Sequence, residues 1–405
     1  MLFTYEAFNR NGVVVNGQVD ADDEKGVVLY LESKELIPSK IRGQGDRIKA
    51  LNFQEIKLFE RLKATEIIFM VRNLATAVRA GLSITEALEI LINDAKPGLA
   101  REILIAARTN VQNGRPLSEA FSQYKRHFPP VFIGLLKAGE VSSQLEKALE
   151  ELSNHLIKEY DLTKKIKSAL VYPALLLVSS FGVIIFLLTF VLPKLAKSFA
   201  LSGTELPLIT KILLSTSNFL VSHIIVLSIL FVSVTAGIIY ASRTPKGKVF
   251  IATVLFRVPV VKDLIKRVAL VRFTRTLGSL LSGASPVLEA LKISSGAVGN
   301  IFYERAIDAV TERVRGGVPL SKDLQEYKEL FPTLLVSLIA VGERTGNIEY
   351  VLGTFSNFYD QEVQNKLKDL TTLFEPLLLI FMGLIIGTIA VAVLLPIYQL
   401  VGKFT

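Results

Sequence analysis

Residues 128–140 read FPPVFIGLLKAGE, and residues 331–343 read FPTLLVSLIAVGE. The second stretch begins 203 residues after the first (331 − 128), and other landmarks coincide at the same offset without a gap. The further matched pairs are Arg72 with Arg275, Glu86 with Glu289, Gly114 with Gly317, Pro116 with Pro319, and Pro173 with Pro376. Proline and glycine landmarks that recur at one fixed spacing indicate a tandem duplication of a structural unit.

Three long uncharged segments interrupt the polar sequence. No Asp, Glu, Lys or Arg occurs in residues 169–192, 212–242 or 376–402. Each segment exceeds the roughly 20 residues that a helix needs to cross a bilayer. Half of the 405 residues are hydrophobic, so the composition also predicts a membrane protein. Residues 1–20 lack a basic stretch followed by an apolar one, so no cleavable signal peptide is expected.

The distribution of lysine and arginine predicts the orientation in the membrane. Basic residues gather before the first uncharged segment, after the second and before the third, whereas residues 194–211 hold only three lysines. By the positive-inside rule, the N-terminus and both repeats face the cytoplasm and the C-terminus lies outside. The middle uncharged segment has no counterpart in the repeat, and it returns the chain to the cytoplasmic side. This basic rim accounts for the net charge of +9, and no nucleic-acid partner is expected.

Within each repeat, Gly and Pro separate short stretches whose apolar residues follow the spacing of a helix. In the first repeat, helices are expected at residues 64–80, 84–94, 99–113, 117–123, 130–138 and 143–167, with counterparts 203 residues later. The predicted fold is an all-α membrane protein. It has two duplicated cytoplasmic bundles of about six helices each, three transmembrane helices and a small N-terminal α+β segment.

These predictions divide the chain into eight parts. The parts are an N-terminal cytoplasmic segment with a linker (1–50), the first cytoplasmic bundle (51–168), the first span (169–193), an external periplasmic loop (194–217), the second span (218–240), a cytoplasmic connector with the second bundle (241–370), the third span (371–397) and an external tail (398–405). In the N-terminal segment, turn residues within 4–20 predict a hairpin, and a helix is expected over 23–34. Residues 42–49 are typical of a linker.

Sequence patterns that carry catalysis are missing. The chain has no cysteine and no G-x-x-x-x-G-K-[ST] phosphate-binding loop. His127, His155 and His223 lack the spacing of a metal site and are expected to be structural. No catalytic residue, metal or cofactor is therefore expected, and the chain is predicted not to be an enzyme.

The candidates for partner contacts are the polar and glycine residues of the repeated motifs. They are Arg72, Gly81, Glu86, Gly139, Glu140, Arg275, Glu289, Gly342, Glu343 and Gly346. Ser83 and Thr85 are the candidate caps of the helix whose first turn contains Glu86. Pro173 and Pro376 stand one turn inside the predicted spans, where a kink or a break of the helix is expected.

The two Gly-Glu pairs also have a structural interpretation. Gly139 and Gly342 follow apolar helices, and a glycine there can adopt the left-handed conformation that ends a helix. Glu140 and Glu343 would then lie near the start of the next helix, where a negative charge complements the helix dipole. The functional interpretation is a contact with a partner or a cation.

The chain resembles the inner-membrane platform proteins of type IV pilus assembly and type II secretion. The similar phrases are RNLA (72–75), AGLS (80–83), EAL (86–88), AGE (138–140), VGERTGNI (341–348) and, at the N-terminus, FTYEA (3–7). The resemblance covers nearly the whole chain. The sequence departs from the family at Ala284 and Ser143, where glycine is usual, and both differences fall in turns.

The resemblance implies a platform in the bacterial inner membrane that couples a hexameric cytoplasmic assembly ATPase to the polymerisation of pilin or pseudopilin subunits. It also implies contacts with other inner-membrane assembly proteins and with the lipid bilayer. Three spans are few for a platform, so a homo-oligomer is expected, with a dimer as the simplest form. The alternative is a permease-like subunit of a transporter powered by a separate ATPase, which the uncharged spans disfavour.

Overall fold

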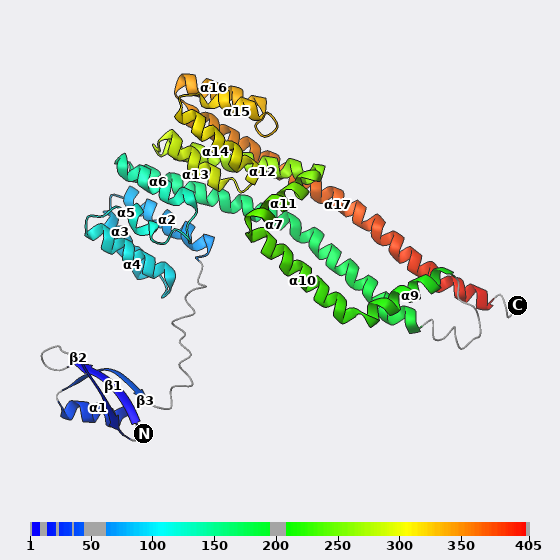
Figure 1. The fold of residues 1–405 in the computed structure, drawn as a ribbon, viewed down its shortest axis with the longest axis horizontal. Helices are drawn as coiled ribbons and strands as arrows, with labels where there is room; N and C mark the ends of the chain where they lie inside the picture. Colours follow the sequence, from blue (N-terminus) through cyan, green and yellow to red (C-terminus); the bar gives the residue numbers. More distant parts are fainter. Residues whose placement is uncertain are drawn as a thin grey trace. The chain divides into compact units, whose positions relative to one another are not determined.

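A computed structural model describes residues 2–8, 14–21, 24–34, 36–43, 62–194 and 208–401 of the chain (Figure 1). The chain divides into two compact units, residues 1–61 and residues 62–405.

The first unit contains a small antiparallel sheet and one helix. Its elements are β1 (Leu2–Phe8), β2 (Val14–Asp20), α1 (Glu24–Ser33) and β3 (Ile37–Gly43). The sheet order is β2-β1-β3, with β1 and β2 forming a hairpin. Helix α1 buries Val27 and Leu31 against a small apolar cluster that includes Val19. The predicted hairpin and helix are confirmed.

Strand β3 is absent from the sequence prediction, and it includes residues 42–43 of the expected linker. Pro38 obscures its pattern because proline cannot donate a hydrogen bond to a sheet. The proline is tolerated because β3 lies at the edge of the sheet. The pairing of β3 with β1 also shifts in register between Glu6 and Ala7 of β1. Residues 44–49, the rest of the expected linker, lie outside the described residues.

The second unit holds both bundles. The first bundle consists of α2 (Ala64–Arg79), α3 (Ile84–Asp94), α4 (Leu99–Gln112), α5 (Leu117–Ser122), α6 (Pro130–Val141) and the first part of α7 (Leu145–Phe186). The second consists of α12 (Pro259–Ser282), α13 (Val287–Ala297), α14 (Ile301–Arg315), α15 (Leu320–Leu324), η4 (Gln325–Tyr327), α16 (Thr333–Thr345) and the first part of α17 (Ile348–Val401). The helices predicted for the first bundle are confirmed to within a few residues at most boundaries.

The apolar spacing explains why these helices pack. In α2, Ile67, Met70, Val71 and Leu74 recur at intervals of three or four residues, and all four are buried. Such a stripe lies on one face of a helix and drives its packing. The buried residues of both bundles form one continuous hydrophobic core. The two bundles therefore pack as one body.

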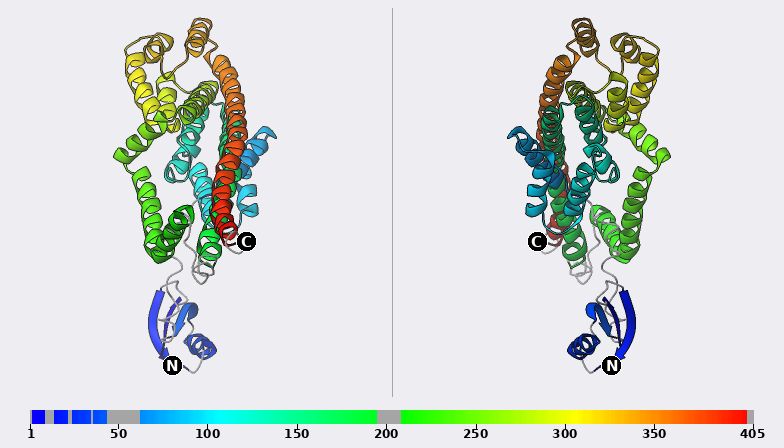
Figure 2. Two further views of the ribbon diagram at one scale, coloured as in Figure 1. Left: turned by 90° about the vertical axis from the view of Figure 1, so that its right-hand side faces the viewer. Right: turned by 90° about the vertical axis from the view of Figure 1, so that its left-hand side faces the viewer.

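Three helices in the described part of the chain are long and apolar enough to cross a membrane. They lie within Leu145–Lys194, Ile224–Ser242 and Ile348–Leu394. Most side chains of these apolar stretches are exposed on the protein surface, as expected where lipid is the solvent. Helices α7 and α17 contact each other and run side by side in the same direction (Figures 1 and 2). The predicted all-α membrane fold is confirmed.

Neither helix is broken at its proline. Pro173 lies inside α7 and Pro376 lies inside α17, and both helices continue for more than ten residues beyond them. A proline removes one backbone hydrogen bond. Ending the helix within a span would leave further backbone groups without partners in lipid, at a higher cost.

Helix α9 (Leu208–Ser222) ties together the ends of the spans that lie away from the bundles. Residues 208–217 of the expected external loop belong to this helix, and α10 (Ile224–Arg243) begins only after a turn at His223. The Thr210 hydroxyl donates to the carbonyl of Ala392 in α17 at 2.7 Å, and the Ser217 hydroxyl donates to the carbonyl of Leu188. No charge separates α9 from α10, so the sequence does not reveal this boundary. Helix α17 likewise continues to Val401, into the expected external tail.

Two non-glycine residues of the described chain have a positive φ, and both follow bundle helices. They are Ser143 (φ 55°) and Ala284 (φ 61°). These are the positions at which the sequence departs from the usual glycine. A side chain in this left-handed conformation costs roughly 1 kcal/mol or more, whereas glycine adopts it freely.

Replacing Ala284 with glycine is therefore expected to raise the free energy of unfolding by about 0.5–1 kcal/mol. The matched control is Gly81→Ala at the corresponding position of the first bundle. Gly81 has φ 90°, and a methyl group added there would meet open space, so that change should lower stability by a similar amount without a steric clash. Thermal unfolding of both variants in detergent measures the two shifts, and shifts of the same sign would contradict the explanation.

Candidate functional site

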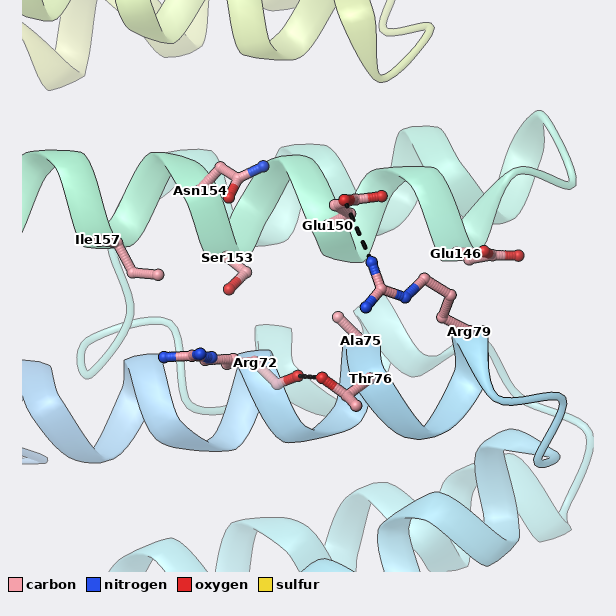
Figure 3. Close-up of a pocket in the computed structure, with 9 residues that line it drawn as sticks. All are labelled: Arg72, Ala75, Thr76, Arg79, Glu146, Glu150, Ser153, Asn154 and Ile157. Carbon is pink, nitrogen blue, oxygen red and sulfur yellow. Dashed lines mark hydrogen bonds and ion pairs between the residues drawn. The ribbon is translucent and has the colours of Figure 1, made fainter.

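A polar groove on the first bundle lies between α2 and α7 and encloses about 290 Å³ (Figure 3). Its lining residues are Arg72, Ala75, Thr76, Arg79, Glu146, Glu150, Ser153, Asn154 and Ile157. Arg79 forms an exposed ion pair with Glu150 at 3.7 Å. Arg72 is exposed and has no ion pair among the described residues. The groove thus offers two arginines and two glutamates to a partner.

The repeat partner of Arg72 lies in a different environment. Arg275 of α12 is only 5% exposed, and its guanidinium lies 2.9 Å from the Asp360 carboxylate of α17. It also lies 3.6 Å from Glu159 of α7. The position that corresponds to Asp360 in the first repeat is Ile157 (360 − 203). Arg72 therefore lacks the carboxylate that holds Arg275.

A cluster of charges surrounds Arg275 where the two bundles meet. Arg272 reaches Glu159 at 2.8 Å, and Lys165 reaches Asp360 at 3.4 Å. These pairs connect α7 of the first bundle with α12 and α17 of the second. Breaking such a partly buried network by removing one partner is destabilising, because the other charge is left without compensation.

His155 is buried beside this cluster. Burial, together with the positive charges of Arg275 and Lys158, lowers the pKa of its imidazole to about 3. The residue lies before the apolar part of α7, outside residues 169–193. Its ring is therefore neutral at physiological pH and helps to fill the contact between the bundles, in agreement with the expected structural role.

Glu140 and Glu343 each cap a helix distant in sequence. The Glu140 carboxylate accepts hydrogen bonds from the backbone N–H groups of Leu117 and Ser118, and from the Ser118 hydroxyl. These donors begin α5, whose own N-cap residue is a proline that offers no side-chain acceptor. A distant glutamate thus satisfies donors that a helix start leaves unpaired.

The second repeat reproduces the same arrangement. The Glu343 carboxylate accepts from the Leu320 N–H at 2.6 Å, from the Ser321 N–H at 3.1 Å and from the Ser321 hydroxyl. The separation in sequence, 22 to 23 residues, is the same in both copies. The glutamates are therefore part of the shared scaffold of the bundle.

The expectation that Gly139 and Gly342 end their helices is wrong. Both glycines lie inside α6 and α16, and the glutamates that follow lie in the same helices. A methyl group at Gly139 would lie 2.4 Å from the Ala148 side chain, and one at Gly342 would lie 3.0 Å from the backbone of Ile348. The glycines allow the next helix to pass close by, and the left-handed turns come later.

The remaining turn glycines behave as turn residues. Gly346, with φ 71°, is the left-handed cap that ends α16. Gly81, with φ 90°, lies between α2 and α3. Both positions favour glycine because a side chain is strained there.

Glu86 and Glu289 share a repeat position but have different neighbours. Ser83 caps α3, as expected, by accepting from the Glu86 N–H, and the Glu86 carboxylate accepts from the Ser83 N–H at 2.9 Å. These bonds from Ser83 lower the pKa of Glu86. Glu289 instead forms an ion pair with Lys137 of the other bundle at 3.0 Å.

The structure therefore does not gather the sequence candidates into one site. Arg275 and Glu289 lie at the contact between the bundles, and Arg72 lies in the groove. Gly139 and Gly342 allow close packing of helices, and the others support turns and caps. The sequence prediction misses Glu159, Asp360 and Lys137, which complete the bundle contact. The sequence contains one signal of this contact: the repeat position that holds Ile157 in the first bundle holds Asp360 in the second. Among the residues with described positions, no cluster of three His, Asp or Glu side chains could hold a metal ion.

Two family models match the chain. The model described as "Type II secretion system (T2SS), protein F" matches residues 70–193 and again residues 273–396. The model described as "Type II secretion system protein F, N-terminal domain" matches residues 1–42. The two longer matches are themselves 203 residues apart (273 − 70), so they coincide with the internal repeat.

Curated relatives align along the full length of the chain. The type IV pilus assembly protein PilC of Thermus thermophilus is 34% identical, with 100% of this chain and 99% of that protein aligned. The PilC protein of Myxococcus xanthus is 31% identical, with 99% and 95% aligned. The type II secretion system protein F of Pseudomonas aeruginosa is 30% identical, with 99% of both chains aligned.

Proposed function

The chain belongs to the family of type II secretion system protein F, and from this membership we propose that it couples a cytoplasmic assembly ATPase to the polymerisation of pilin or pseudopilin subunits. It is an inner-membrane platform protein of a pilus assembly or secretion system, and its family is non-catalytic. The hexameric ATPase would supply the chemical energy. This chain would bind the ATPase on the cytoplasmic side and transmit its motion to the membrane.

The observation that carries the proposal is the continuity of each bundle with one span. Helix α7 has 42 residues and α17 has 54 residues, and each begins in a bundle and continues through an apolar segment. At 1.5 Å per residue these helices extend roughly 60 and 80 Å. A rotation or displacement imposed on the bundles would therefore reach the membrane through two continuous helices, without a loop that could absorb it.

The proposed orientation places the N-terminus and both bundles in the cytoplasm and the C-terminus outside. The parallel course of α7 and α17 supports this arrangement because parallel spans require a return helix, and α10 fills that role. Pilins or pseudopilins and other inner-membrane assembly proteins would contact the spans, and the platform would be a homo-oligomer.

A pull-down of the tagged chain from detergent-solubilised membranes tests the coupling proposal. Mass spectrometry is expected to identify an assembly ATPase together with pilin-like subunits. The purified chain should then bind that ATPase and change its rate of ATP hydrolysis. An unchanged rate together with no binding would contradict the proposal. Recovery of a nucleotide-binding subunit with a solute-binding protein would instead favour the permease-like alternative.

A further inference from the structure

Each bundle contributes one face to the contact within the chain, and the repeat supplies a second copy of each face. Helices α6 and α7 of the first bundle pack on α12 and α13 of the second. By the repeat offset of 203 residues, α12 and α13 correspond to α2 and α3, and α6 and α7 correspond to α16 and α17. The α2–α3 face consists of Phe69, Arg72, Ala77, Ala80 and Ile90, and the α16–α17 face consists of Ser337, Leu338, Phe358 and Glu362.

The faces used within the chain are closely packed. A methyl group on Gly134 would lie 2.5 Å from the Ile293 side chain and 3.2 Å from that of Leu280. One on Gly283 would lie 2.6 Å from the Leu135 side chain. Leu135 and Leu280 are fully buried. This contact therefore excludes water from the surfaces of both bundles.

The corresponding faces are more exposed in the described chain, although Ala77 and Leu338 pack partly against the core. Phe69 and Ile90 are each 55% exposed, although their counterparts Arg272 and Ile293 are covered by the first bundle. Phe358 is 49% exposed, whereas its counterpart His155 is 5% exposed. Ser337 and Ala80 are also exposed, whereas Gly134 and Gly283 are buried. Large apolar side chains exposed outside the membrane mark surfaces that bind a partner.

We propose that the α16–α17 face of one copy of this chain packs on the α2–α3 face of a second copy, as α6 and α7 pack on α12 and α13 within the chain. Two different surfaces meet in such a contact, so it is heterologous and builds a ring or an open array. Because α7 and α17 run in the same direction, the operation that relates the repeats keeps the spans parallel. Each added copy therefore enters the same membrane.

Side-chain volumes differ at three positions between the contact within the chain and the proposed contact. Within the chain, Gly134 faces Ile293 and Leu280. Between copies, Ser337 takes the place of Gly134 and would face Ile90 and Ala77. Ala77 is smaller than Leu280, its counterpart, and leaves room for part of the serine side chain. Ala80 replaces Gly283 opposite Leu338, so the two copies would pack slightly farther apart at this point than the two bundles do within the chain.

One of the two ion pairs of Glu159 has a counterpart across the proposed contact, because Phe69 replaces Arg272 whereas Arg72 replaces Arg275. Arg272 and Arg275 hold Glu159 across the contact within the chain. The counterpart of Glu159 is Glu362, and the counterpart of Arg275 is Arg72. Arg72 has no ion pair in the described chain, whereas the carboxylate of Glu362 is 31% exposed and forms an ion pair with Arg267. Glu362 of one copy would therefore meet Arg72 of the next.

Disulfide formation in membranes tests this inference, because the natural chain contains no cysteine. One tagged copy carries Ile90→Cys and a second, differently tagged copy carries Ser337→Cys. Mild oxidation of membranes that contain both is expected to give a species of twice the mass of one chain that carries both tags. The matched control is Gly134→Cys with Ile293→Cys in one chain, which should link without an increase in mass.

Each outcome decides the matter. If the control pair links and the test pair does not, the inference is overturned. If Ile90→Cys copies link to each other, the contact is a symmetric one of another kind, and the inference is also overturned.

A second readout uses the exposed Phe69: Phe69→Glu should shift the detergent-solubilised protein from oligomer to monomer on a native gel, whereas Ile105→Glu, an exposed change on α4, should not. The inference does not depend on the ATPase, so its failure would leave the proposed coupling untouched.

Discussion

Replacing Arg275 with alanine is expected to lower the free energy of unfolding by about 3 kcal/mol, because it leaves two carboxylates without their shared cation. Asp360 is only 18% exposed, and Glu159 is 31% exposed. Removing the guanidinium also removes the arginine of this cluster that contacts both α7 and α17 from α12, although Arg272 still pairs with Glu159 and Arg267 with Glu362. Thermal unfolding of the full chain in detergent, followed by circular dichroism, measures the loss.

The repeat offers an internal control for this change. Arg72→Ala removes the same side chain from the same position of the first bundle, where it is exposed and has no ion pair in the described chain. That variant should change stability by no more than about 0.5 kcal/mol. Adding Asp360→Ile to Arg275→Ala copies Ile157 of the first repeat and should recover part of the loss. Equal losses for the two arginines would show that the cluster does not hold the bundles.

Replacing Glu140 with alanine is expected to destabilise the first bundle by about 2–3 kcal/mol. Its carboxylate accepts from two backbone N–H groups and one hydroxyl at the start of α5. Ser118 is buried, so water cannot easily replace the lost acceptor. Hydrogen exchange of the amides of Leu117 and Ser118, measured by mass spectrometry, should become faster.

Glu343→Ala is the matched variant in the second bundle, and its effect should be confined to the amides of Leu320 and Ser321. Glu140→Gln keeps one acceptor oxygen and should lose less stability than Glu140→Ala. A partner-contact role for Glu140 predicts the opposite pattern, in which stability and exchange stay the same while binding of a partner is lost.

Much of this fold is predictable because its determinants are local. Gly and Pro residues delimit helices such as α3 and α5, and the three spans follow from uncharged stretches. Prediction fails where the determinant is not local. The boundary between α9 and α10 carries no charge, and β3 contains a proline that only its place at the sheet edge explains.

The site is less predictable than the fold because its contacts join residues far apart in sequence. The Gly-Glu motif is visible in the sequence, but the partner of Glu140 begins a helix 22 residues earlier. Arg72 and Arg275 stand in equivalent positions, yet one is exposed and the other is buried. The two arginines differ in exposure because Ile157 stands where the second repeat has Asp360, and because the first bundle covers Arg275. No local sequence pattern specifies how the two bundles pack.

Helix α10, which has no counterpart in the repeat, has a consequence for the ancestry of such a chain. A half-length ancestor with one bundle and one span would have met its own copies in a common membrane, all in the same orientation. Fusing two such genes end to end requires one additional crossing, which α10 supplies. Fusion also fixes the two halves in equal number, so that each half can accumulate its own substitutions. Ile157 and Asp360 occupy one repeat position and differ in this way.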